Sequence, residues 1–154
     1  MFGYRVQVKQ FAAEAEWQTL VEGAYVAGVE GGQGGFVFDY DVLASLEPVA
    51  YTGRFRAEYA RMGDQNMLNV RFDQVAEGDA VPADARYFLA HGPAGGLFDL
   101  AIPANIDDDN PERSATEAVE ARVRWVRGVG GVADAIASGG DLDAGTAVVA
   151  VECW

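Results

Sequence analysis

The sharpest chemical feature of the sequence is a run of acidic residues between two prolines. Asp107, Asp108 and Asp109 are followed by Asn110, and carboxylate and amide oxygens are the ligands that Ca²⁺ prefers. The run lacks the alternating ligand positions, the central glycine and the distal glutamate of an EF-hand loop. Such a run is ordinarily a solvated acidic loop, and a Ca²⁺ site at these three aspartates is the alternative.

Two shorter acidic pairs alternate along the chain. Asp39 and Asp41 flank one tyrosine, and Asp141 and Asp143 flank one leucine. Alternation places both carboxylates of a pair on one side of an extended chain. Turn or helix-cap roles are expected for both pairs, because short acidic side chains bind nearby backbone N–H groups.

Two pairs of alternating arginines are the candidate interface residues. Arg54 and Arg56 lie in one strand-like segment, and Arg122 and Arg124 lie in another. With aromatic residues nearby, they would form a basic stripe for an acidic partner. Cross-strand pairing with the chain's own acidic residues is the other interpretation.

No catalytic motif of high specificity is found. The glycine-rich segment 28–35 is followed by Phe36 rather than by the Lys-Ser/Thr of a phosphate-binding loop, so a hairpin tip is expected there. His91 and Cys153 are the single histidine and cysteine, which excludes a conventional zinc site. The serines at 45, 114 and 138 lack a nucleophile elbow. The sequence therefore predicts no enzyme, cofactor or internal disulfide. A hydrolase or isomerase built from spatially paired carboxylates is the third hypothesis for function.

Alternation of apolar and polar residues dominates the chain and is typical of strands with one wet face. The pattern predicts strands over segments 2–9, 24–29, 36–40, 49–62, 66–75, 85–91, 97–102, 118–127 and 146–153. Segment 12–20 fits either a helix or a strand. Segment 42–46 is expected to form one helical turn before Pro48, and segment 130–138 a short helix that ends at two glycines.

These elements predict a mainly β protein, a single antiparallel β-sandwich or barrel over residues 1–154 with one or two short helices. The chain has 154 residues, of which half are hydrophobic, and 19 glycines. A domain of about this length can bury a core without disulfides or metals. Both chain ends are expected to lie in the sheet.

The net charge limits the kinds of partner that the protein can bind, and the first residues bear on its location. The 11 basic and 24 acidic residues give a net charge of −13, which disfavours binding to nucleic acid or to an anionic membrane surface. The first ten residues alternate instead of forming a signal peptide, and no apolar stretch is long enough to cross a bilayer. A virion or the cytoplasm is the expected location.

The function expected from these features is a non-enzymatic structural or assembly role. A small β-module with open edge strands would associate with itself or with a larger scaffold, as capsid decoration, cement, minor capsid and tail proteins do. The alternative is a carbohydrate- or small-molecule-binding module that uses Trp17, Tyr87 and Trp125 with Ca²⁺ at residues 107–109.

Overall fold

The computed structural model describes residues 1–12, 14–48, 52–76, 84–103, 118–139 and 142–151. One helix, α1 (Tyr40–Leu46), and ten strands make up this part of the chain. The strands are β1 (Phe2–Val8), β2 (Gln18–Gly28), β3 (Gly31–Asp39), β4 (Thr52–Met62), β5 (Gln65–Ala76), β6 (Arg86–Gly92), β7 (Gly95–Ile102), β8 (Ala118–Val126), β9 (Gly130–Gly139) and β10 (Leu142–Val151).

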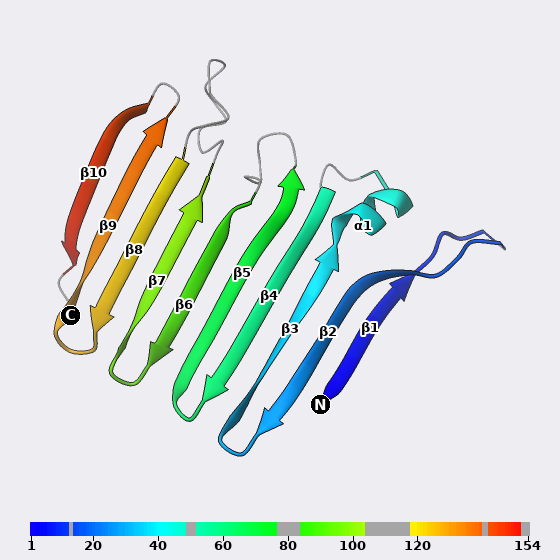
Figure 1. Ribbon diagram of the computed structural model, residues 1–154, viewed down its shortest axis with the longest axis horizontal. Helices are drawn as coiled ribbons and strands as arrows, with labels where there is room; N and C mark the ends of the chain where they lie inside the picture. The colour runs from blue at the N-terminus through cyan, green and yellow to red at the C-terminus, as the bar shows by residue number, and fades with distance from the viewer. Residues whose placement is uncertain (13, 49–51, 77–83, 104–117, 140–141, 152–154) are drawn as a thin grey trace.

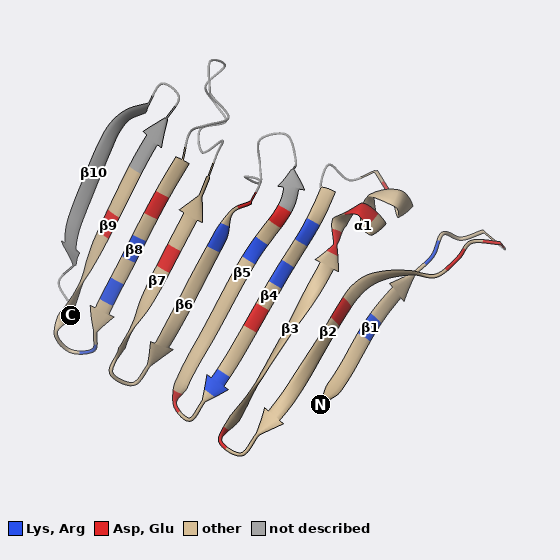
Figure 2. Cartoon of the chain, in the orientation of Figure 1, with Lys and Arg blue, Asp and Glu red and all other residues tan. Residues whose placement is uncertain are grey.

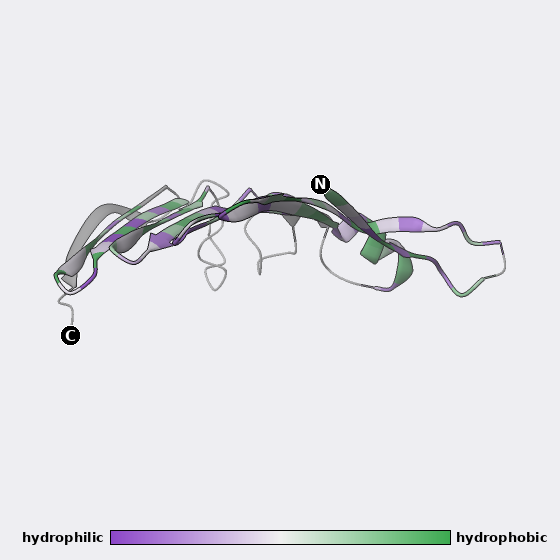
Figure 3. Cartoon of the chain, turned by 90° about the horizontal axis from the view of Figure 1, so that it is seen from below, coloured by the Kyte–Doolittle hydropathy of each residue, from purple (hydrophilic) through white to green (hydrophobic). Residues whose placement is uncertain are grey.

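The ten strands form one antiparallel sheet in which each strand pairs with its neighbours in the sequence (Figure 1). The mainly β, antiparallel class and the short helix expected from the sequence are confirmed. The sheet is open, with β1 at one edge and β10 at the other. Viewed edge-on, it is a single bowed layer (Figure 3). The described strands therefore lie in one layer rather than in two facing layers or a closed cylinder.

Several predicted pairings are confirmed in detail. The segments predicted as an antiparallel pair are β4 and β5, which pair from Thr52 with Ala76 to Met62 with Gln65. The hairpin predicted around Pro93 joins β6 to β7, with Gly92 paired to Gly95. The segment predicted as a strand from about Ala118 is β8. Short hairpins fix the register on each side and so decide which residues share a face.

The hairpin predicted between segments 24–29 and 36–40 is confirmed as β2 and β3, but the prediction that the run of glycines forms its tip is wrong. Glycines 31, 32, 34 and 35 lie inside β3, and the turn that precedes it consists of Val29 and Glu30. A Cβ atom at Gly32 would lie 2.2 Å from the Tyr25 hydroxyl, and one at Gly34 would lie 2.8 Å from the Tyr59 hydroxyl. The glycines lie in the strand because aromatic side chains from neighbouring strands occupy the space beside them.

The short helix expected over segment 130–138 is also wrong, because this segment belongs to β9. It pairs with β8 from Ala118 with Ser138 to Val126 with Gly130. Its alternate positions carry alanine, so the contrast between its two faces is small in the sequence. Pairing with both neighbouring strands overrides the helix propensity of alanine.

The helical turn expected over 42–46 is confirmed as part of α1. Asp39 is its N-cap, since its Oδ1 atom accepts hydrogen bonds from the N–H groups of Asp41 at 3.1 Å and Val42 at 3.2 Å. The Asp41 carboxylate in turn accepts from the N–H of Gly53 at 2.9 Å. Both acidic residues therefore have the cap and turn roles predicted for them, and they tie α1 to β4.

Asp39→Ala should reduce the free energy of unfolding by about 1 kcal/mol, because it removes the cap of α1. Asp39→Asn keeps a capping oxygen and loses only the ion pair with Arg54, whose side chain is 58% exposed, so its cost should be smaller. Urea unfolding followed by circular dichroism measures both. Equal losses in the two variants would contradict the capping role.

Candidate functional site

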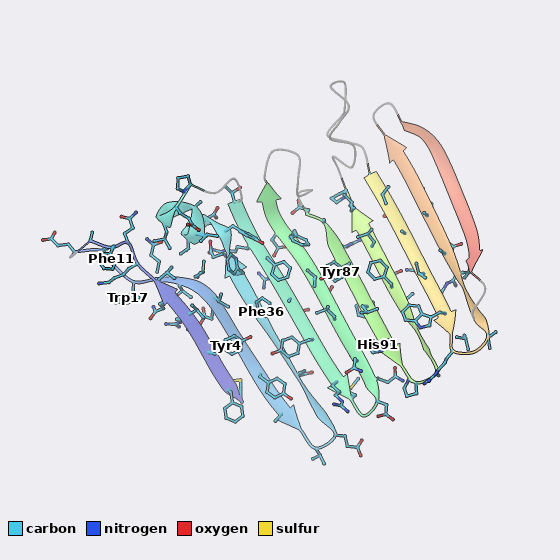
Figure 4. All side chains as sticks on the ribbon, turned by 180° about the vertical axis from the view of Figure 1, so that it is seen from behind. Tyr4, Phe11, Trp17, Phe36, Tyr87 and His91 are labelled. Atoms are coloured by element: carbon cyan, nitrogen blue, oxygen red, sulfur yellow. The ribbon has the colours of Figure 1, made fainter. Side chains whose placement is uncertain are left out.

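The register places most large apolar side chains of the sheet, including every described aromatic strand residue except Phe88, on one side, here called the apolar face. Residues paired directly across antiparallel strands point to the same side, and alternate residues point to opposite sides. Figure 4 shows this side, with Tyr4, Phe36 and Tyr87 labelled. The apolar face consists of Phe2, Tyr4, Val6, Val21, Tyr25, Phe36, Phe38, Phe55, Ala57, Tyr59, Leu68, Val70, Phe72, Tyr87, Leu89, Phe98, Leu100, Ile102, Val119, Ala121, Val123 and Trp125.

Aromatic rings on the apolar face pack against their cross-strand neighbours. The Phe55 ring centroid lies 5.7 Å from that of Phe36 and 5.2 Å from that of Phe72. These rings surround the centre of the sheet, where Val70 is 1% and Ala57 is 3% exposed. Ala85, at 7%, is the one other buried hydrophobic residue in the described part of the chain. The face thus makes a shallow cluster in which most side chains are half-buried, and its exposed members are Phe2, Tyr4 and Val6 at the β1 edge.

At the β1 edge, tyrosine rings lie over glycines of the next strands. A Cβ atom at Gly23 would lie 2.4 Å from Tyr4 Cζ, and the rings of Tyr25 and Tyr59 stack at 6.3 Å between centroids. The pKa of Tyr4 is raised from its ordinary value of 10.0 by loss of solvent contact and then by the hydroxyl of Tyr59. The tyrosines extend the apolar face to the edge of the sheet.

Charged residues lie on strands β1 to β9 (Figure 2), and the register places all of them except Arg61 on the opposite side, here called the polar face. Cross-strand ion pairs join Arg5 to Glu22, Arg54 to Asp39, Arg56 to Asp73, Arg122 to Asp99 and Arg124 to Asp134. Every arginine in these pairs is more than two-fifths exposed. These exposed ion pairs therefore have a modest stabilising effect. Apolar side chains lie on the same face, among them Val26, Met67, Phe88 and Leu97.

The four arginines considered as interface residues all lie on this polar face. Arg54 Nε lies 3.1 Å and Arg56 Nε 3.3 Å from their carboxylate partners. Arg122 and Arg124 pair with acidic residues of β7 and β9, and the hydrogen bond to Asp99 raises the pKa of the Arg122 guanidinium. These four arginines therefore pair across strands with the chain's own acidic residues, which was the second interpretation of the sequence pattern.

The acidic run at Asp107, Asp108 and Asp109 lies outside the described residues, as does Asp141. Within the described ranges, no group of three or more histidine, cysteine, aspartate or glutamate residues is placed to hold a metal ion. The Ca²⁺ site considered for this run thus stays a prediction.

The aromatic residues considered for a ligand site are not brought together. Tyr87 and Trp125 lie on the apolar face, in β6 and β8. Trp17 lies just before β2, near the opposite edge of the sheet, where Lys9 Nζ lies 5.2 Å from the centre of its ring. Trp17 is 61% exposed, and the neighbouring Phe11 is fully exposed. No single pocket of the described residues collects the three rings.

Sequence reasoning missed the apolar face as one continuous surface. The signal was present, because almost every predicted strand alternates and consecutive strands are joined by short turns. In a meander, these two facts align the apolar sets of successive strands on one side. The structure adds that no second layer of strands faces them in the described part of the chain, where the Tyr40 ring of α1 packs on Phe38 at 4.8 Å.

Comparisons with known proteins were made for the whole chain. No protein-family model, no curated protein and no solved structure matches it. The described helix is too short to cross a bilayer.

Proposed function

We propose that this protein is a non-enzymatic assembly module, which associates with copies of itself or with a larger scaffold. The apolar face carries the proposal. A sheet normally buries its apolar side against a second layer, and exposed apolar patches of more than a few hundred Å² mark interaction sites. A virion component is one form that such a module would take.

The surface area supports this proposal quantitatively. The chain exposes 10171 Å², whereas a compact monomer of 16.4 kDa is expected to expose about 7,500 Å². The excess of about 2,700 Å² per chain is larger than the area each partner contributes to a standard protein interface, about 800 Å². An association that covers the apolar face would remove part of this excess.

The solution mass, measured by chromatography with light scattering in Ca²⁺ and again in EDTA, tests the proposal. We expect a discrete oligomer of fixed size whose mass and melting temperature do not respond to either addition. A monomer stabilised by Ca²⁺ would overturn the assembly role and favour a Ca²⁺-assisted binding module at residues 107–109. A monomer that ignores Ca²⁺ would also overturn self-association.

A further inference from the structure

We propose that the apolar face is covered by the same face of a second copy of this chain, so that two single-layer sheets form one two-layered sandwich. This inference rests on the proposed assembly function. It specifies the surface that associates, the apolar face, and the partner, a second copy of the chain. The sandwich predicted from the sequence would then form between two chains instead of within one. Sheets that pack face to face lie about 10 Å apart, with side chains from the two inner faces interdigitated.

The excess area is large enough for a dimer of this kind. Two chains that each lost the whole excess of about 2,700 Å² would bury about 5,400 Å², so an interface within the range of about 2,000–5,000 Å² for obligate homodimers needs only part of it. Such interfaces resemble a domain core cut in half and are more apolar than transient ones. The described part of this chain has three buried hydrophobic residues. Its apolar face would form one half of a core, and the second copy would supply the other half.

The charge distribution selects the apolar face over the polar face. Each chain has a net charge of −13, and the cross-strand ion pairs described above lie on the polar face. Among the strands β1 to β9, Arg61 is the one described residue of the apolar side that carries a full charge, and its Nε donates to Gly63 O at the β4–β5 turn. Contact between apolar faces therefore leaves the ion pairs of the polar face in solvent.

The longest segment outside the described residues is too polar to cover this face. This segment is 104–117, in which Ile106 is the single large apolar side chain and six residues are charged. Covering an aromatic surface with such a segment would bury charges at high cost. A second copy supplies an apolar surface of equal size, and a two-fold axis makes that surface self-complementary.

Neighbouring residues of β6 provide a matched pair of variants. Leu89 lies on the apolar face, opposite Leu68 and Phe98, whereas Ala90 lies on the polar face, opposite Met67 and Leu97. Leu89→Asp should raise the dimer dissociation constant about 30-fold or more, the effect of a hot-spot residue. Ala90→Asp should leave it unchanged. Light scattering over a dilution series gives the constants, and circular dichroism reports the strand content of each variant.

A measurement on the natural chain covers the case in which Leu89→Asp fails to fold. Hydroxyl-radical footprinting with mass spectrometry should show Phe36, Tyr87 and Phe98 protected in the oligomer and reactive after dilution to monomer. Phe11, which is fully exposed, should react equally in both. Protection confined to the apolar face supports the inference.

The outcomes separate this inference from the proposed function. An oligomer in which the three apolar-face rings react as fast as Phe11, or one weakened by Ala90→Asp but not by Leu89→Asp, overturns the stacked arrangement and keeps the assembly role. Protection of the apolar face by a scaffold protein in a chain that is otherwise monomeric also overturns it. A natural chain that is monomeric and without a partner overturns both.

Discussion

Val70→Asp should cost at least about 4 kcal/mol of unfolding free energy and leave little folded protein. Val70 is 1% exposed and lies between Ala57 of β4 and Tyr87 of β6 on the apolar face. A carboxylate at this position would be surrounded by aromatic rings and would have no basic partner on that side of β5. Urea unfolding followed by circular dichroism measures the loss.

Val126→Asp is the control for this prediction, because it makes the same substitution at an exposed site. Val126 is 55% exposed and lies at the end of β8 on the polar side, where a charge remains in water. Its effect should be within about 0.5 kcal/mol. Comparable losses in the two variants would mean that Val70 is not at the centre of the fold.

Gly95→Ala should cost about 3 kcal/mol, for two reasons that act together. Gly95 has φ +147°, a backbone conformation that side chains of L residues rarely adopt, and a Cβ atom there would lie 2.1 Å from the Trp125 carbonyl oxygen. The clash is with backbone, so β7 and β8 would have to separate at this end of their pairing.

Gly3→Ala is the control for this prediction. It tests whether the loss of unfolding free energy comes from the backbone conformation and contacts of Gly95 or from replacing any glycine of a strand. Its Cβ atom would come no closer than 3.9 Å to another residue, the carbonyl oxygen of Gly23. The variant should be neutral or slightly stabilised, because alanine lowers the entropy of the unfolded chain. Thermal unfolding of both variants, read by circular dichroism, decides the point, and a large loss in Gly3→Ala would refute the steric argument.

The strands were predictable wherever large and charged side chains alternate. In β8, Val119, Val123 and Trp125 lie on one face while Arg122 and Arg124 lie on the other, and the sequence shows this directly. The caps at Asp39 and Asp41 were predictable for a similar reason, since their effect is local. Interactions between residues near in sequence leave a pattern that a single chain displays.

The two wrong predictions depend on residues distant in sequence. Gly34 was assigned to a turn because its neighbours are glycines, yet it lies in β3 under Tyr59, which is 25 residues later. Segment 130–138 shows mostly alanine at alternate positions, so only its pairing with β8 and β10 reveals a strand. In both cases, the cross-strand neighbour decides the structure and local composition does not.

The candidate site was predicted only in part. Alternation tells which residues share a face of a sheet, but not whether a second layer of the same chain faces them. The arginines at 54, 56, 122 and 124 attracted attention because charge stands out in a sequence. The apolar face is made of residues that, one by one, look like an ordinary core.

The order of the strands has a consequence for how this protein can change in length. Each described strand pairs only with the strands before and after it in the sequence, so the molecule is a one-dimensional array, as repeat proteins are. Removing or duplicating one hairpin would leave every other pairing and the sidedness of the whole sheet intact. Insertion or loss of hairpins would then widen or narrow the apolar face in steps of two strands, which gives evolution a direct means of adjusting the size of a partner surface.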